Sequence, residues 1–459
     1  MNAVLRDTRS YVLLLAFVLL ELATVLVGLK FPVEACLAIA GAWGLWYVSR
    51  KTFTGICVLI LLHYFVIRGT KDVSIAEIVF ALCFASVLGV WFFRKLFLRR
   101  QPILTEKFDY ALAGFFLLCA CSIIPAVLFG SNVMKWLREF IPFLTLLYIF
   151  PLREQVNSPK RLAIVIACFL LLCLAVAVDN VLSYKAAVTN VVYAWELLSS
   201  RRHANEPLFM AMVIAASSFL ILAKSKLAQL ATLVVLAFFG ITLALTFSRG
   251  YWVGALAGLL MLFWLFPARL KGRMLVYLSV FSLLVFGVIF LFFGDLATFV
   301  LDTVTRRFTT VGQAGQDLSF LARVAETEAV LSQIQSNPIM GYGFGKMYSF
   351  DPPIPMEMPT WYVHNTYLFL WYKVGLLALL CLLTFMSGIF QSCLRAYKTA
   401  KTNQARALLL GIVACLTGLA VVSFSSPQMV EKDSALLVTL LCGVAQSISM
   451  RQNSRPPRA

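Results

Sequence analysis

Apolar runs long enough to cross a lipid bilayer follow one another along most of this 459-residue chain, and they limit its fold more than any other feature. Hydrophobic residues make up 61% of the sequence and charged residues only 13%, which excludes a soluble globular protein. Because backbone polar groups cannot stay unpaired in lipid, the apolar runs are expected to be helical. The sequence therefore predicts an all-α polytopic integral membrane protein.

We expect about 12 to 14 transmembrane helices, because an apolar run of roughly 20 residues crosses the hydrocarbon core as a helix. The predicted regions are helices over 1–295, an external loop over 296–365 that holds an amphipathic helix and the candidate site, helices over 366–450, and a tail over 451–459. The candidate spans lie at 11–29, 31–48, 53–68, 75–97, 110–129, 139–152, 162–182, 207–223, 227–247, 250–267, 273–295, 366–390, 406–425 and 435–450.

Basic residues set the expected orientation of the chain in the membrane. The formal net charge is +18, and Lys and Arg gather in short segments between apolar runs, as in Phe93–Lys107 and Pro267–Arg273. The positive-inside rule places such short basic loops in the cytoplasm. Alternating spans then place both termini in the cytoplasm and the loop over 296–365 outside. The same placement argues against a nucleic-acid-binding surface.

The cysteines and histidines do not predict a metal site. The eleven cysteines lie within or at the edges of apolar runs and form no CxxC pair, so we interpret them as packing residues. The three histidines, His63, His203 and His364, do not cluster with cysteines or carboxylates in a zinc pattern. We therefore expect no metal and no other cofactor.

Arg249 lies in the sequence TFSRGYWVGALAGLL, where one apolar run ends and the next begins almost without a loop. Its guanidinium is therefore expected at the membrane surface, where a planar fork of donors suits phosphate oxygens. The alternative is an interfacial arginine that extends its charge to water. Arg201 and Arg202 precede another apolar run, and they are either substrate contacts or part of a solvated loop.

The external loop is expected to contain an amphipathic helix that ends at Asn337-Pro338. The apolar residues that recur there at helical spacing are Leu318, Leu321, Val324, Leu331 and Ile334. Arg323 lies on this helix with Glu326 three residues later, so the two could simply form an exposed ion pair. The sequence GYGFG at 341–345 is interpreted as a tight turn after the helix.

His364 stands at the mouth of the next apolar run, in the sequence WYVHNTYLFL. Histidine is the side chain that exchanges a proton near neutral pH, so His364 is a candidate general base. The neighbouring Asn365 could orient the imidazole or a sugar hydroxyl, and Tyr367 is a candidate substrate contact. The alternative for His364 is a hydrogen-bonded structural residue.

Three stretches in order, SRGYWVGALAGL, NPIMGYGFG with an arginine-bearing helix before it, and HNTYLFLWYKVG, resemble the O-antigen ligase family of bacterial membrane proteins. The family joins O-antigen ligases with related O-antigen and exopolysaccharide polymerases. The resemblance covers roughly residues 243–376, and the order of the three stretches is more specific than any one of them. Lys373 departs from the family pattern, which usually has Glu there, and a lysine inside a span needs a partner or a polar cavity.

The resemblance implies a metal-independent, inverting glycosyltransferase in the bacterial inner membrane, with its active site facing the periplasm. The donor would be an undecaprenyl-diphosphate-linked glycan. Arg249 and Arg323 would bind the diphosphate, and His364 would be the catalytic residue. The acceptor would be a lipid A-core sugar in a ligase, or a second lipid-linked glycan in a polymerase.

Other classes remain open from the residues themselves. A transporter or flippase for lipid-linked oligosaccharides would need ionisable residues deep within spans, and Glu21 and Asp179 are candidates. A peptidoglycan-type polymerase would need a catalytic carboxylate, for which no motif is found. The one-sided distribution of the unusual polar groups favours an enzyme.

Overall fold

The computed structural model describes residues 50–66, 75–189, 205–246, 248–293, 318–350 and 362–453. The described residues form helices and loops without a strand element, which confirms the all-α prediction. The chain divides into two compact units, Met1–Arg99 and Arg100–Ala459. In the first unit, α3 (Thr52–Val66) packs against α4 (Ile75–Phe93), which continues into the short π-helix η1 (Arg94–Leu98).

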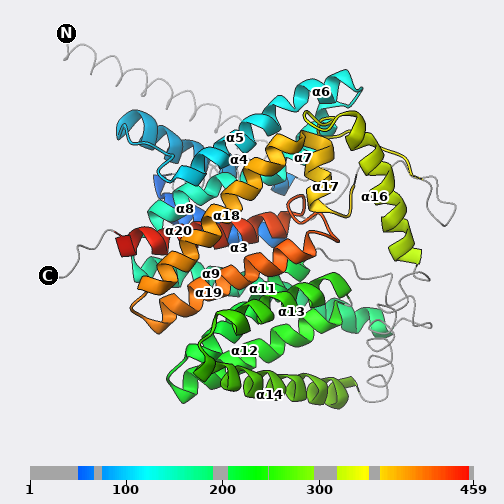
Figure 1. Cartoon of the computed structure of the whole chain (residues 1–459). Coiled ribbons are helices and arrows are strands. Elements are labelled where there is room, and N and C mark those ends of the chain that lie inside the picture. The colour runs from blue at the N-terminus through cyan, green and yellow to red at the C-terminus, as the bar shows by residue number, and fades with distance from the viewer. Residues whose placement is uncertain are drawn as a thin grey trace, which may run out of the picture. The chain divides into compact units, whose positions relative to one another are not determined.

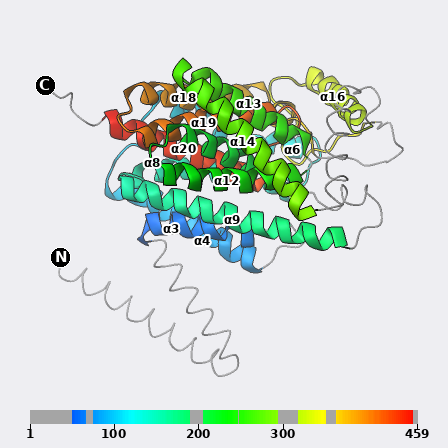
Figure 2. The same ribbon diagram turned by 90° about the horizontal axis from the view of Figure 1, so that it is seen from below.

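The second unit is a bundle of long apolar helices with several short helices at one end (Figure 1). Figure 2 shows α9 extending along the length of this unit. Its helices are α5 (Lys107–Cys121), α6 (Ile123–Leu128), α7 (Val133–Leu144), η2 (Thr145–Tyr148), α8 (Ile149–Gln155), α9 (Pro159–Thr189), α11 (Glu206–Leu222), α12 (Lys226–Leu245), α13 (Arg249–Leu265), α14 (Ala268–Phe293), α16 (Leu318–Ser336), α17 (Thr366–Val374), α18 (Leu376–Thr399), α19 (Asn403–Val422) and α20 (Lys432–Asn453).

Within the described residues, seven helical segments are long and apolar enough to cross a membrane, so the chain is a multi-pass membrane protein. They are Glu77–Leu98, Lys107–Leu128, Pro159–Ser183, Lys226–Leu245, Leu376–Thr399, Asn403–Val422 and Lys432–Gln452. Three shorter apolar helices accompany them. The expected spans at 11–29 and 31–48 lie outside the described residues, and the total of about 12 to 14 stays a prediction.

The expected span at 139–152 is helical throughout, but it is not one uniform α-helix. The chain there forms α7, η2 and α8 in succession, with Pro142 inside α7 and Pro151 inside α8. Proline removes a helix hydrogen bond and crowds the preceding turn, which explains the short pieces. Arg153 at the end of this stretch reaches Asp109 at the start of α5 (N–O distance 2.6 Å), so the broken segment returns along the whole of α5 and α6.

The expected span at 366–390 is also two helices, because Gly375 separates α17 from α18 with φ at +90°. A Cβ atom at this position would collide with the carbonyl oxygen of Ile339. The GYGFG sequence packs against the same end of α17, where the amide of Gly343 donates to the carbonyl of Lys373 over 2.7 Å. GYGFG is therefore more than a tight turn, because it holds α17 in place.

Three helices of the second unit, α11, α13 and α19, pack closely against one another. Close approach of α13 to α19 depends on Gly258, where a Cβ atom would stand 2.9 Å from the carbonyl oxygen of Ala414. At the start of α13, a Cβ atom on Gly250 would stand 2.9 Å from the hydroxyl oxygen of Ser425. This packing places the start of α13 against the loop between α19 and α20.

Candidate functional site

A buried carboxylate on α16 holds His364 in place. Glu326 is only 4% exposed, and its Oε2 lies 2.8 Å from Nδ1 of His364. Its other oxygen, Oε1, accepts a hydrogen bond from the backbone amide of His364 over 2.7 Å and one from the hydroxyl of Tyr348 over 2.8 Å. In Figure 1, α16 lies beside α17, the helix that follows His364. Glu326 thus fixes both the backbone and the ring of His364.

The contact with Glu326 also sets the tautomer of His364. A carboxylate accepts hydrogen bonds, so Nδ1 carries the proton and Nε2 keeps its lone pair. The side chain of His364 is 40% exposed, whereas that of Glu326 is 5% exposed. The pair therefore presents a basic nitrogen toward an accessible region with the carboxylate behind it, which is the arrangement of an oriented general base.

The sequence left open an exposed ion pair between Arg323 and Glu326, and the burial of the Glu326 carboxylate argues against an exposed pair. The buried face of α16 is defined by Val330 and Ile334, whereas Val324 and Leu331 are 39% and 36% exposed. Glu326 precedes Val330 by four residues, so it belongs to this buried face. A carboxylate in register with two buried apolar residues was the signal in the sequence.

The residues after His364 shape the first turn of α17. The side-chain oxygen of Asn365 accepts hydrogen bonds from the amides of Tyr367 and Leu368, over 2.9 Å and 3.1 Å. Asn365 is therefore the N-cap of α17. Its oxygen is therefore occupied by the helix, and a substrate role for the side chain stays a prediction. The hydroxyl of Tyr367 donates to the carbonyl of Ala420 over 2.8 Å, and its substrate role stays a prediction.

A second carboxylate, Glu431 in the loop between α19 and α20, gathers three hydroxyl groups. It accepts hydrogen bonds from Tyr362 over 3.1 Å, Tyr251 over 3.2 Å and Ser426 over 3.3 Å. Desolvation in this site raises the pKa of Glu431 to about 7. Burial and the nearby Glu431 carboxylate also raise the pKa of Tyr362 above its ordinary value, so the tyrosine stays a donor. Sequence reasoning did not identify Glu431 as a site residue.

The predicted diphosphate-binding arginines lie on the two helices that carry these networks. Arg249 is the first residue of α13, two residues before Tyr251, and it is half-buried. Arg323 is exposed on α16, three residues before Glu326. Both arginines therefore lie within one helical turn of a residue in the two carboxylate networks. Arg201 and Arg202 lie outside the described residues.

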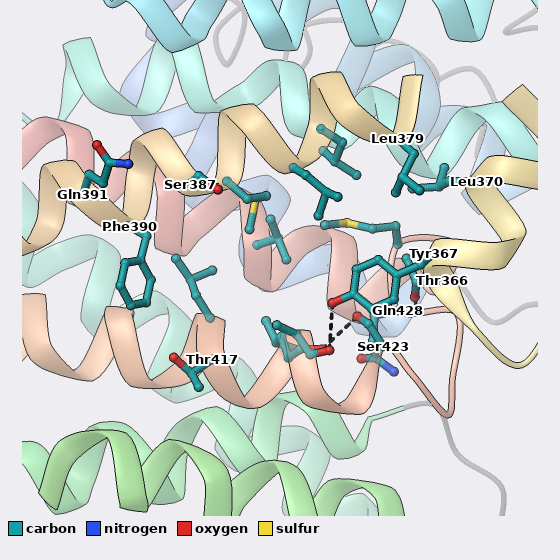
Figure 3. Close-up of a pocket in the computed structure, with 18 residues that line it drawn as sticks. Thr366, Tyr367, Leu370, Leu379, Ser387, Phe390, Gln391, Thr417, Ser423 and Gln428 are labelled. Carbon is teal, nitrogen blue, oxygen red and sulfur yellow. Dashed lines mark hydrogen bonds between the residues drawn. The ribbon is translucent and has the colours of Figure 1, made fainter. Parts of the chain in front are cut away.

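An elongated cavity of about 440 Å³ is lined at one end by Thr366, which follows His364 by two residues in the chain (Figure 3). Its polar end is formed by Thr366, Tyr367, Ser423 and Gln428, and it extends between α18 and α19 toward Gln391. Leucine, methionine and phenylalanine side chains line most of its length. The cavity therefore has a polar end at the start of α17 and a mostly apolar length between α18 and α19, which are both long and apolar enough to cross the membrane.

Lys373, the departure from the family pattern, is fully buried and has the partner that a lysine in a span needs. Its Nζ lies 3.1 Å from a carboxylate oxygen of Glu139 on α7 and also donates to the carbonyl of Lys346. The other oxygen of Glu139 accepts from the amide of Gly345 over 2.8 Å. This ion pair ties α7 to the GYGFG segment and to α17, so its role is structural.

The fold and site together define a multi-pass membrane protein with an oriented histidine at the end of its helix bundle. In a comparison with known families, residues 232–383, about a third of the chain, match the model of the family described as O-Antigen ligase. This match confirms the resemblance drawn from the three sequence motifs, and it spans Arg249, Arg323, Glu326 and His364. No curated protein matches the chain.

Proposed function

We propose that this protein is a glycosyltransferase that passes a lipid-linked glycan to a sugar hydroxyl. The observation that carries the proposal is the pairing of His364 with the buried Glu326 inside the segment that matches the O-antigen ligase family. Ligases and polymerases both need a base for an incoming hydroxyl. A tautomer fixed with Nε2 unprotonated supplies that base.

The proposed reaction is a single displacement. Nε2 of His364 takes the proton of the acceptor hydroxyl while its oxygen forms a bond to the anomeric carbon. The bond from that carbon to the diphosphate oxygen breaks, and the undecaprenyl diphosphate leaves with the electron pair. Attack on the face opposite the leaving group inverts the anomeric configuration. Glu326 stabilises the imidazolium that forms, as the carboxylate does in a catalytic triad.

Negative charge grows on the diphosphate as it leaves, and Arg249 and Arg323 are proposed to bind it. Guanidinium groups donate paired hydrogen bonds to phosphate oxygens, which stabilises this charge in the transition state. Within the described residues, no group of three or more His, Cys, Asp or Glu side chains is placed to hold a metal ion. We expect transfer by the purified protein to persist in excess EDTA, and a requirement for magnesium or manganese would contradict the arginine proposal.

The acceptor decides between two forms of the activity. A ligase would join the glycan to lipid A-core, and a polymerase would join it to another lipid-linked unit. Analysis of polysaccharide and lipid carriers in a deletion strain separates them. Polymer that stays on its lipid carrier indicates a ligase, and single repeat units indicate a polymerase.

Variants of His364 test the chemistry itself. His364→Ala and His364→Gln should both abolish transfer while the protein stays in the membrane at a normal level. The glutamine variant retains a side-chain donor toward Glu326 but has no basic nitrogen. Normal transfer by either well-expressed variant would exclude His364 as the base.

The proposed site faces the periplasm of a bacterial inner membrane, with both termini in the cytoplasm, because the short basic loops are then all inside. Single cysteines at Ser349 and Lys398, in a background without the eleven native cysteines, test this orientation. The cysteine at 349 should react with a membrane-impermeant maleimide in intact spheroplasts, and the cysteine at 398 only after lysis. The reverse pattern would place His364 away from periplasmic glycans and exclude the proposal.

A further inference from the structure

Glu431 and the three hydroxyl groups that it accepts from, those of Tyr251, Tyr362 and Ser426, form the Glu431 cluster. This cluster connects two parts of the chain that the proposed reaction needs in fixed positions. Its Oε2 accepts from Tyr251, the third residue of α13, and Arg249 is the first residue of that helix. Its Oε1 accepts from Tyr362, two residues before His364. One carboxylate therefore bonds to a tyrosine next to the candidate diphosphate-binding residue and to a tyrosine next to the candidate base.

Tyr362 also joins this cluster to the Glu326 network. Its carbonyl oxygen lies 2.8 Å from the hydroxyl oxygen of Tyr348, and this hydroxyl shares its single proton between that carbonyl and Glu326. Its ring packs edge-on against the imidazole of His364, with the ring centroids 5.0 Å apart. A displacement of Tyr362 would therefore move both the ring that flanks His364 and the hydrogen bonds behind it.

On the side of the Glu431 cluster toward α13, hydrogen bonds also fix the position of the Tyr251 side chain. Tyr251 is 5% exposed, and its hydroxyl accepts a hydrogen bond from Nε2 of Gln428 over 2.9 Å while it donates to Glu431. Gln428 in turn accepts from the hydroxyl of Ser434 over 2.8 Å, and its backbone amide donates to the hydroxyl of Thr366 over 2.8 Å. These hydrogen bonds leave Glu431 as the acceptor that the Tyr251 hydroxyl requires.

We propose that Glu431 is a positioning residue that fixes the start of α13, with Arg249, relative to the segment that carries His364. This proposal rests on the proposed glycosyl transfer, which needs the diphosphate and the acceptor hydroxyl aligned on opposite sides of one anomeric carbon. Glu431 touches neither group and acts through the two tyrosines. It also lies outside the segment that matches the family, so the family motifs do not include it.

The test removes the two hydroxyl contacts singly and together. Tyr251→Phe and Tyr362→Phe should each lower kcat by roughly 10- to 100-fold, because small misplacements of reacting groups cost about that much, while KM for the acceptor changes little. Each variant breaks the same connection, so the double variant should be no slower than the slower single variant. Ser426→Ala is the matched control, because it removes one hydroxyl contact to Glu431 and leaves the hydroxyls of Tyr251 and Tyr362 on the carboxylate.

A distance measurement separates this proposal from the proposed reaction. Spin labels at Val253 on the exposed face of α13 and at Glu328 on the exposed face of α16 report the relative position of the two helices without transfer activity. The distance distribution should broaden in Tyr251→Phe and Tyr362→Phe and stay narrow in Ser426→Ala. Unchanged distributions in both tyrosine variants, or losses of kcat that multiply in the double variant, would overturn the role of Glu431. Broadened distributions in a protein without transferase activity would retain that role and exclude only the reaction.

Discussion

Replacement of Glu326 by glutamine should invert the tautomer of His364. Oε1 of Glu326 accepts two hydrogen bonds, from the amide of His364 and the hydroxyl of Tyr348. In the variant, the amide oxygen of glutamine must occupy this position, so its NH₂ group faces Nδ1. An NH₂ group is a donor, and Nδ1 would then accept while Nε2 carries the proton. The variant would thus have a histidine that cannot take a proton from the acceptor.

The expected loss of kcat follows from the hydrogen bonds that the variant must break to restore the reactive tautomer of His364. Rotation of the amide would lose both contacts of the oxygen, at about 1 kcal/mol each, and the charge-assisted contact with Nδ1 is lost in any case, at about 2 kcal/mol. The total of about 4 kcal/mol corresponds to roughly a thousandfold in kcat, at about 1.4 kcal/mol for each tenfold.

The assay is transfer from a purified lipid-linked donor to its acceptor, with wild-type protein, Glu326→Gln and Glu328→Gln. Glu328 is exposed on the same helix, so Glu328→Gln controls for the loss of a negative charge from α16. Glu328→Gln should retain wild-type kcat. A Glu326→Gln protein with kcat within about twofold of wild type would refute the tautomer argument, because a merely supporting contact needs no specific acceptor.

Three further predictions concern the arginines, the second carboxylate and the buried lysine. Arg249→Lys and Arg323→Lys should each recover only part of the kcat lost in the alanine variants, since a point charge cannot reproduce the paired hydrogen bonds of a guanidinium; full recovery would show that charge alone suffices. The pKa of Glu431 rises on folding from 4.5 to about 7, so the folded state binds more protons between these values and stability should fall by about 3 kcal/mol as pH rises through 7. Thermal unfolding in detergent should show a smaller decline in Glu431→Gln, and an identical pH dependence would contradict the shift. Lys373→Met should lower stability by roughly 3 to 5 kcal/mol by leaving Glu139 buried without its partner, and addition of Glu139→Gln should recover most of the unfolding temperature.

The sequence predicted the class of fold because hydropathy acts along the whole chain, and the helical class is confirmed. The prediction of individual spans failed at breaks within the helices, because these breaks depend on local backbone geometry. Gly375 lies inside an apolar run that reads as one span, and only its position against Ile339 shows why the chain turns there. Pro142 and Pro151 were visible signals for the broken segment, but the contact between Arg153 and Asp109 that returns it along α5 depends on tertiary structure.

The candidate site was predictable to the extent that single residues stand out. His364 was identified from its place at the mouth of an apolar run, and its orientation by Glu326 required knowledge of which face of α16 is buried. Glu431 lies 67 residues beyond His364 in the chain. Its bond to Tyr251 depends on the packing of α13 against α19, and its bond to Tyr362 depends on the contact between the start of α17 and the loop after α19, so no sequence spacing revealed them.

The hydrogen bond between the Tyr348 hydroxyl and the Tyr362 carbonyl has a consequence for how this family of sites can diversify. It fastens the two ends of the stretch 349–361 to each other and to Glu326, independently of what lies between them. Lengthening a closed stretch adds only about 0.6 kcal/mol of closure entropy for each doubling. Insertions and exchanges in 351–361 should therefore accumulate at little cost to the Glu326–His364 pair, so the length and composition of this stretch can vary while His364 keeps its place.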